Sequence, residues 1–232
     1  GLVGSEMCIR DRVSALLTAT MVCGMSVVPA VGVAAADDTI TVGFSQVGAE
    51  SDWRTANTES MKSTFSEENG YELIFDDAQQ KQENQLTAIR NFIQQEVDYI
   101  LLAPVTETGW DTVLQEAKDA DIPVIIVDRM VDVSDDSLYT TWIGTDSLLE
   151  GRKAAEWLNA YTTAKGIDAK DVNIVDIQGT IGSTAQIGRS KGLEEGVDNY
   201  GWNLLAQQSG EFTQAKGCLL YTSDAADEAR SV

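Results

Sequence analysis

Two short segments decide the fold: Asp98-Tyr-Ile-Leu-Leu-Ala103, closed by Pro104, and Ile122-Pro-Val-Ile-Ile-Val127. Each is a continuous apolar run of strand length. Such runs are typical of parallel strands that are covered on both faces, whereas half-exposed strands alternate apolar and polar residues. Between the two segments, apolar residues around Trp110 and Leu114 recur at helical spacing. Strand, helix and strand in this order predict a βαβ unit within a parallel sheet.

The same alternation continues in both directions along the chain. Before this unit, strands are predicted over residues 40–45 and 71–75, and helices after Ser51 and over 83–97. After it, a strand is predicted over 139–144. A second series begins with a helix over 148–161 and a strand over 172–177, and continues with a helix over 183–197 and a strand over 203–206. We therefore predict an α/β protein with a doubly wound layer over about residues 39–145, followed by a second sheet that stops before it can close.

Both ends of the chain differ from the rest. Residues 1–12 and 218–232 resemble translated sequencing-adapter read-through, and we expect both to be foreign. Residues 13–36 are typical of a signal peptide, with an apolar run, a breaker at Pro29 and small residues before a cleavage point near Ala36. Lipidation of Cys23 is the alternative to cleavage. The two lobes are then expected at residues 37–145 and 146–217.

Composition excludes several classes of function. The formal net charge is -21, and no cluster of lysine or arginine offsets it locally, so binding to DNA or RNA is not expected. The chain has no histidine, the commonest metal ligand and general base near neutral pH. Residues 37–217 hold no cysteine either, which removes thiol nucleophiles and cysteine metal sites from that region.

Polar residues follow the predicted strands, where ligands bind in open parallel sheets. Trp53 and Arg54 come after the first strand, and Asp128 and Arg129 come after the fourth. A carboxylate accepts hydrogen bonds from hydroxyl groups, a guanidinium donates to them, and an indole covers the apolar face of a sugar ring. The combination suits a neutral polyhydroxylated ligand. The alternative is that such loops are polar only because they meet water.

Enzyme motifs are weak. The loop Gly179-Thr-Ile-Gly-Ser183 lacks the Gly-Lys-Ser/Thr ending of a phosphate-binding loop. The adjacent acids Asp76-Asp77 and Asp135-Asp136 are more often solvated than catalytic. The four other tryptophans, at positions 110, 142, 157 and 202, are expected to pack in the core or on the surface rather than to contact a ligand.

Several separate motifs carry a resemblance to a known family. They are Thr41-Val-Gly-Phe-Ser-Gln-Val-Gly48, Glu50-Ser-Asp-Trp-Arg54, Asp77-Ala-Gln-Gln-Lys-Gln-Glu-Asn-Gln85, Ala103-Pro-Val-Thr-Glu-Thr-Gly-Trp110, Pro123 to Arg129, Gln178-Gly-Thr180, Arg189-Ser-Lys-Gly192 and Gln208-Ser-Gly-Glu-Phe-Thr213. Together they resemble the periplasmic galactofuranose-binding proteins and their ribose-type relatives, the type 1 periplasmic binding proteins of ABC importers.

The resemblance implies a monomeric, exported, sugar-binding protein without cofactor, metal or catalytic residues. The implied fold is that of the type 1 periplasmic binding proteins, two Rossmann-like doubly wound lobes, of which the second is incomplete here. Such a protein would hold a monosaccharide between the lobes and deliver it to a membrane permease, in the periplasm or at the cell surface. Motif matching places the ligand contacts on eight residues: Glu50, Ser51, Asp52, Trp53, Arg54, Asp128, Arg129 and Arg189. Asp52 departs from the family pattern, in which a glycine is more usual. The family chain also continues beyond Gly217, where further contacts are expected.

Three other functions compete with transport. A repressor's sugar-sensing domain shares the implied fold, but it needs a DNA-binding helix-turn-helix where this chain has an export signal. A secreted enzyme would have to rely on carboxylates alone. Presentation of the sugar to a sensor receptor stays open, because sequence does not separate it from transport.

Overall fold

In the computed structural model, residues 39–228 are described. The predicted foreign segment 1–12 and the predicted signal peptide 13–36 lie outside the described residues, as do the last four positions of the predicted foreign tail. Between residues 39 and 228, no helix combines the length and the apolar character that crossing a membrane requires.

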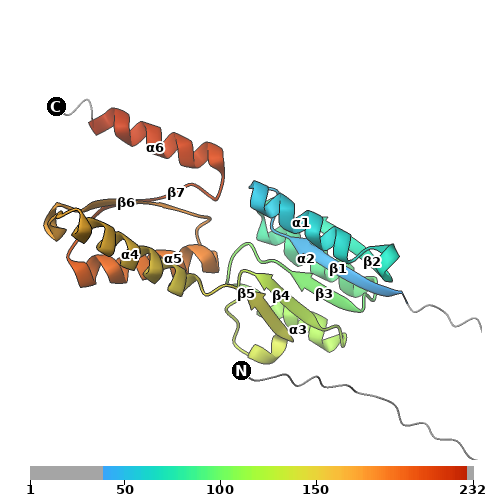
Figure 1. Ribbon diagram of the computed structural model, residues 1–232. Helices are drawn as coiled ribbons and strands as arrows, with labels where there is room; N and C mark the ends of the chain where they lie inside the picture. Colours follow the sequence, from blue (N-terminus) through green and yellow to red (C-terminus); the bar gives the residue numbers. More distant parts are fainter. Residues whose placement is uncertain (1–38, 229–232) are drawn as a thin grey trace, which may run out of the picture. The chain divides into compact units, whose positions relative to one another are not determined.

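The first lobe is built on a sheet of five parallel strands (Figure 1). They are β1 (Ile40–Gln46), β2 (Tyr71–Asp77), β3 (Tyr99–Leu102), β4 (Val124–Asp128) and β5 (Thr141–Gly144). Their order is β2-β1-β3-β4-β5, and all pairs are parallel. The five strands predicted from the sequence are confirmed, and so is the parallel sheet.

Three helices connect these strands: α1 (Asp52–Thr64), α2 (Gln82–Gln94) and α3 (Asp111–Asp119). The helix predicted after Ser51 is α1, and Ser51 caps it, because its side chain accepts a hydrogen bond from the Arg54 N–H at 3.2 Å. A short 3-10 turn, Glu67–Asn69, follows this helix. Gly70 ends that turn with a φ of 84°, a left-handed conformation that glycine adopts without strain. A second such turn, Asp136–Leu138, precedes β5.

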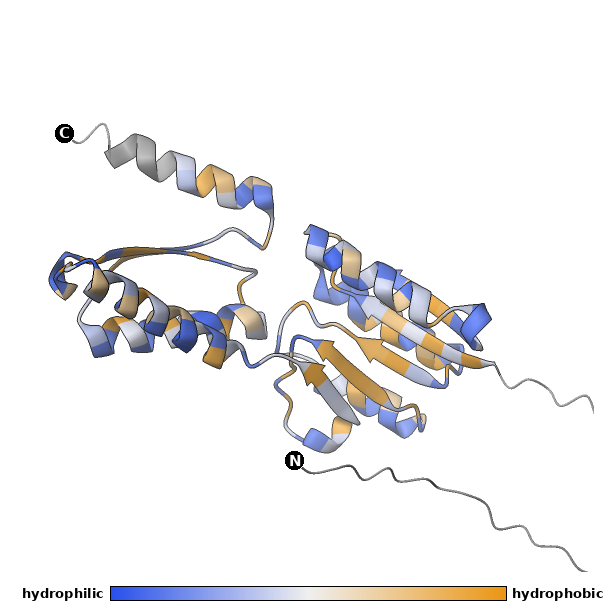
Figure 2. Cartoon of the chain, viewed as in Figure 1, coloured by the Kyte–Doolittle hydropathy of each residue, from blue (hydrophilic) through white to orange (hydrophobic). Residues whose placement is uncertain are grey.

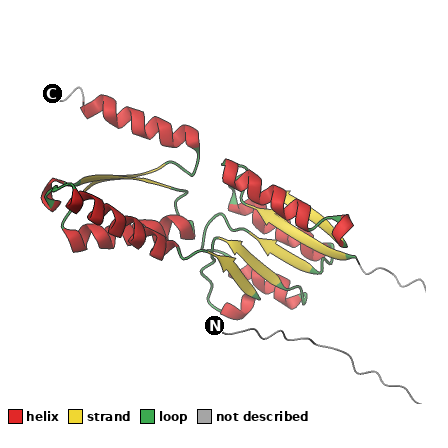
Figure 3. Ribbon diagram, viewed as in Figure 1, coloured by secondary structure: helices red, strands yellow, loops and turns green. Residues whose placement is uncertain are grey.

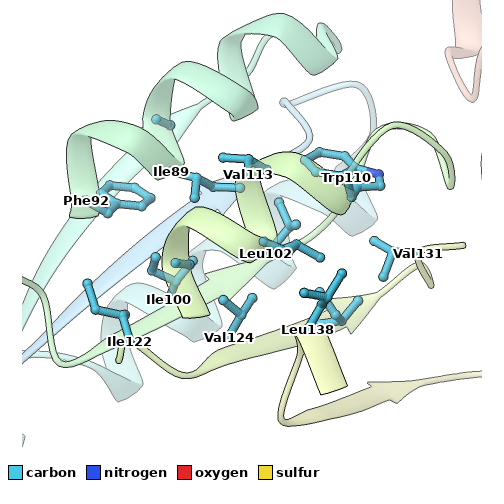
Figure 4. Packing of buried hydrophobic residues seen from close by; sticks show 14 of the residues in the cluster. Ile89, Phe92, Ile100, Leu102, Trp110, Val113, Ile122, Val124, Val131 and Leu138 are labelled. Atoms are coloured by element: carbon cyan, nitrogen blue, oxygen red, sulfur yellow. The ribbon is translucent and has the colours of Figure 1, made fainter. Parts of the chain in front are cut away.

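Neighbouring residues of one strand pack against opposite faces of this sheet. Ile100 and Leu102 join a core cluster with α2 and α3, which Figure 4 shows from close by. Leu101 lies in a second cluster, together with Phe44 and with the half-buried Met61 of α1. Helices therefore cover both faces, which confirms the doubly wound arrangement and explains why β3 is apolar throughout.

The second lobe contains a smaller sheet, with β6 (Asn173–Gln178) parallel to β7 (Asn203–Ser209) (Figure 3). Its helices are α4 (Ser147–Ala164), α5 (Thr184–Tyr200) and α6 (Gln214–Glu228), with a 3-10 turn at Ala169–Asp171. The four elements predicted for this lobe are confirmed. Helix α6 was not predicted, because most of it lies in the predicted foreign tail, residues 218–232.

The two lobes differ in how well they are packed. Buried residues of the second lobe form one small cluster of Ala155, Val172 and Trp202. Several of its apolar side chains are exposed instead, among them Val175, Ile177 and Leu205 on the two strands. Figure 2 shows the contrast, with β3 and β4 strongly hydrophobic inside the first lobe and mixed residues over the second.

Candidate ligand-binding site

Arg54 is held at the centre of the site by two carboxylates. It lies in the first turn of α1, and the residue is only 2% exposed. Its Nε donates to Glu50 Oε1 at 3.0 Å, and one terminal nitrogen donates to Asp128 Oδ2 at 2.8 Å. Asp128 ends β4 with a φ of 65°, which is uncommon for a residue other than glycine. Such backbone strain often marks functional sites.

Arg129 is the second buried guanidinium. It donates to the Val105 carbonyl at 3.0 Å, and its other terminal nitrogen lies 3.7 Å from Glu50 Oε1. Burial, and next the charge of Arg54, lower the pKa of Arg129 to about 10. Arg129 is therefore still protonated at neutral pH, and Glu50 lies between two cations.

The second lobe contributes Arg189 and Phe212. Arg189, on α5, donates its Nε–H to Glu150 Oε2 of α4 at 2.8 Å. The guanidinium of Arg129 lies 5.1 Å from the centre of the Phe212 ring, and that of Arg189 lies 6.0 Å from it. The ring occupies the space that a side chain at position 179 would need, so Gly179 makes room for it. Phe212 and the preceding Glu211 both have positive φ, 58° and 53°.

These side chains surround a cavity of about 310 Å³. Trp53 forms part of its wall and is 58% exposed, with the Arg54 guanidinium 4.9 Å from its ring centre. The residues that line the cavity are Glu50, Ser51, Trp53, Arg54, Asp128, Arg129, Thr145, Glu150, Ala185, Arg189 and Phe212.

Two residues that line the cavity each have a buried polar atom without a hydrogen-bond partner among the described residues: Glu50 Oε2 and Arg54 Nη1. A buried polar atom without a partner costs free energy, typically about 1–3 kcal/mol and more for charged groups. One atom accepts and the other donates. A ligand that offers both a donor and an acceptor, as a hydroxyl group does, fits this pair.

The structure brings together seven of the eight predicted contact residues in one cavity wall, and Asp52 is the exception. Asp52 is exposed at the first position of α1, where the helix dipole favours a negative charge. Sequence reasoning missed four lining residues: Thr145, Glu150, Ala185 and Phe212. A usable signal existed for Phe212, which lies in the motif 208–213, and for Glu150, which follows the crossover into α4.

Other polar residues near the strand ends serve the fold. Gln46 donates to the side chains of Asn57 and Thr58 at 2.8 and 3.0 Å. Trp110 and Trp202 are buried, as predicted for packing residues, while Trp157 is exposed on α4 and stacks on Tyr161. Among residues 39–228, no group of three or more His, Cys, Asp or Glu side chains is placed to hold a metal ion.

A parallel α/β fold in two lobes, with a polar cavity lined from both, is that of the type 1 periplasmic binding proteins. The chain belongs to the periplasmic binding protein domain family, whose model matches residues 42–230. It is 48% identical over 179 residues to the galactofuranose-binding protein YtfQ of Escherichia coli strain K12, covering 77% of this chain.

Solved structures agree with this assignment. A crystal structure of a galactofuranose-binding protein matches with a TM-score of 0.76 and 46% identity, over 82% of this chain and 62% of that one. The binding component of an arabinose ABC transporter from Shewanella sp. ANA-3, bound to L-arabinofuranose, matches with a TM-score of 0.74 and 47% identity, over 82% and 61%. The chain spans about half the length of its curated relatives, 54% for the E. coli protein.

Proposed function

We propose that this chain is the sugar-binding part of an ABC importer and holds a monosaccharide in the cavity around Arg54. Glu50 and Arg54 line the cavity beside the exposed ring of Trp53, and each carries a buried polar atom without a partner among the described residues; this single observation carries the proposal. The similarity to proteins that bind galactofuranose and arabinofuranose supports a sugar in the furanose form.

Each side chain then has a defined task. Arg54 donates to a hydroxyl or ring oxygen through the nitrogen that has no protein partner, and Glu50 accepts from a hydroxyl through Oε2. Asp128 and Arg129 repeat this pairing at the end of β4, and Arg189 approaches from the second lobe. Trp53 covers the apolar C–H face of the ring.

The proposal extends to the rest of the protein's role. The bound sugar is released unchanged, so the protein binds and delivers without catalysis. It acts as an exported monomer, and its partner is a membrane permease. Two lobes enclose the sugar, residues 37–145 and 146–217, and they close around it by a hinge motion.

The test is thermal unfolding of the chain with a panel of pentoses and hexoses that includes galactofuranose, arabinose and fructose. It uses the 232-residue chain and an extended chain, in which the residues after Gly217 are the corresponding remainder of the E. coli relative. A ligand at a hundred times its Kd should add about 2.7 kcal/mol of stability.

Two tryptophan variants serve as a matched pair. Trp53→Ala should lose most of the shift, whereas Trp157→Ala, which removes an equally exposed ring outside the cavity, should keep it. No shift with any sugar in either folded chain would overturn the proposal.

A further inference from the structure

The wall of the cavity is formally neutral. Three arginines and three carboxylates line it: Arg54, Arg129 and Arg189, and Glu50, Asp128 and Glu150. Glu50 and Asp128 neutralise the two buried arginines through the contacts described above. One cation and one carboxylate remain, and both come from the second lobe.

Glu150 is the partner of that remaining cation. Its Oε2 lies 2.8 Å from Arg189 Nε, and among the described residues no other carboxylate pairs with Arg189. The two terminal nitrogens of Arg189 make no hydrogen bond to a described residue. An arginine whose two terminal nitrogens are unpaired can donate two parallel hydrogen bonds, and it is the preferred protein group for binding carboxylate and phosphate. Without Glu150, Arg189 would be an anion-binding group in the wall of the cavity.

The fold holds Glu150 in this position. It lies in the first turn of α4, where the helix dipole favours a negative charge, and Asp146 caps the same helix end. Gly151 lets α4 approach α5 until its backbone touches the Arg189 carbonyl, so that no side chain fits at position 151. This close approach fixes the relative position of the two helices that carry Glu150 and Arg189.

We infer that Glu150 is a specificity-determining residue of the cavity. By neutralising Arg189 it excludes anionic sugars, such as uronic acids and sugar phosphates, and leaves the site to neutral ones. The inference rests on the proposed function and deepens it. Its alternative is an ordinary surface ion pair between α4 and α5, because the two side chains are 38% and 48% exposed.

The molecule supplies a matched control for that alternative. Arg152 of α4 and Glu195 of α5 form a second pair with the same atoms, Nε and Oε2, 2.6 Å apart. Their side chains are 49% and 33% exposed, and neither residue lines the cavity around Arg54. Glu195→Gln therefore removes the same charge from the same helix pair, away from the proposed site.

The experiment measures Kd for the neutral sugar found above and for its uronic acid, at low and at high salt. It uses both chains described for the proposed function, as wild type, Glu150→Gln, Glu150→Asp and Glu195→Gln. In Glu150→Gln, affinity for the uronic acid should rise about tenfold relative to wild type, and the gain should shrink as salt screens it. Glu150→Asp, which keeps the charge, and Glu195→Gln should exclude the uronic acid as the wild type does.

The outcomes separate the inference from the proposed function. If the wild type binds a neutral sugar but Glu150→Gln gains nothing for the uronic acid, the inference is wrong and the function stands. An equal gain in Glu195→Gln would also overturn it, because a general charge effect would then suffice. If neither chain binds any neutral sugar, the proposed function is wrong and the inference falls with it.

Discussion

At the scale of single residues, Glu50 balances two buried cations. Its side chain is 2% exposed, and it contacts Arg54 at 3.0 Å and Arg129 at 3.7 Å. Removing one partner of a buried ion pair leaves an uncompensated charge, which typically costs about 3–5 kcal/mol. Burial, and next the repulsion from Arg54, lower the pKa of Arg129.

We therefore expect Glu50→Gln to lower the free energy of unfolding in urea by about 3 kcal/mol at neutral pH. The matched control is Glu116→Gln, which breaks the exposed pair between Arg90 and Glu116. Exposed pairs contribute about 0–1 kcal/mol. A loss at position 50 as small as the control's would show that Glu50 does not carry this charge balance.

Two aspartates should give pH dependences of opposite sign. Desolvation, and then the charge of Asp77, raise the pKa of Asp76 above 3.8. The unfolded chain then ionises first, so this carboxyl costs stability as pH rises above 3.8. Hydrogen bonds from Ser134, first its hydroxyl and then its N–H, lower the pKa of Asp111 below 3.8. That carboxylate stabilises the fold above 3.8, and the contribution is lost as pH falls through its folded pKa.

Chemical denaturation of both variants from acid to neutral pH checks these signs. Relative to the wild type, Asp76→Asn should gain stability as pH rises, and Asp111→Asn should lose it. The pH-dependent difference should disappear below 3.8 for Asp76→Asn, and below the lowered folded pKa for Asp111→Asn. The same slope in both variants would contradict the assignment.

Sequence identified the site residues that follow strands of the first lobe, but it missed Phe212 and Glu150, which reach the cavity through the local fold. Trp53, Arg54, Asp128 and Arg129 follow strands of one parallel sheet, and the carboxyl ends of such strands meet at one edge. Phe212 reaches the cavity because of two consecutive left-handed residues, and Glu150 because α4 and α5 approach closely. Neither feature leaves a periodic pattern in the sequence.

At the scale of elements, the strands were predictable and their exact ends were not. Strand β3 is apolar because its residues meet a core on both faces, so composition alone reveals it. Helix α6 escaped prediction because most of it lies in the segment predicted to be foreign, and Leu219 and Tyr221 on it are exposed. That residues 218–232 are foreign stays a prediction.

Helix α5 approaches α4 through glycines spaced four residues apart, at positions 188, 192 and 196. A Cβ atom at position 192 would lie 2.6 Å from the backbone of Arg152 and of Leu148. Because backbone atoms cannot move aside as a side chain can, the two helices would have to move apart. Alanine normally stabilises a helix relative to glycine by about 1 kcal/mol. At position 192 we expect the reverse, because overpacking typically costs about 1–3 kcal/mol.

Urea unfolding of Gly192→Ala, followed by circular dichroism, measures this loss of stability. Gly217→Ala is the control, since a Cβ atom there meets nothing within 4 Å. It should cause no loss. A Gly192→Ala variant as stable as the wild type would mean that the helices separate freely, and the fixed position of Glu150 would lose its support.

At the scale of the whole molecule, the two lobes should differ in stability. The first lobe buries large side chains on both faces of five strands, among them Phe44, Ile100 and Trp110. The second buries three core residues and leaves apolar side chains of β6 and β7 exposed. Since burial of apolar surface supplies about 25 cal/mol per Å², the lobe with fewer buried residues should open more readily.

We therefore expect amide hydrogens of β1, β3 and β4 to exchange much more slowly than those of β6 and β7 in the 232-residue chain. Unfolding should follow two steps, with the environment of Trp202 changing at lower denaturant than that of Trp110, as single-tryptophan variants would report. A sugar held by residues of both lobes should raise the denaturant midpoint of the first step more than that of the second. The reason is that the sugar stabilises only the state in which both lobes are folded. One cooperative transition with equal protection in both sheets would show that the small second core is not the weaker one.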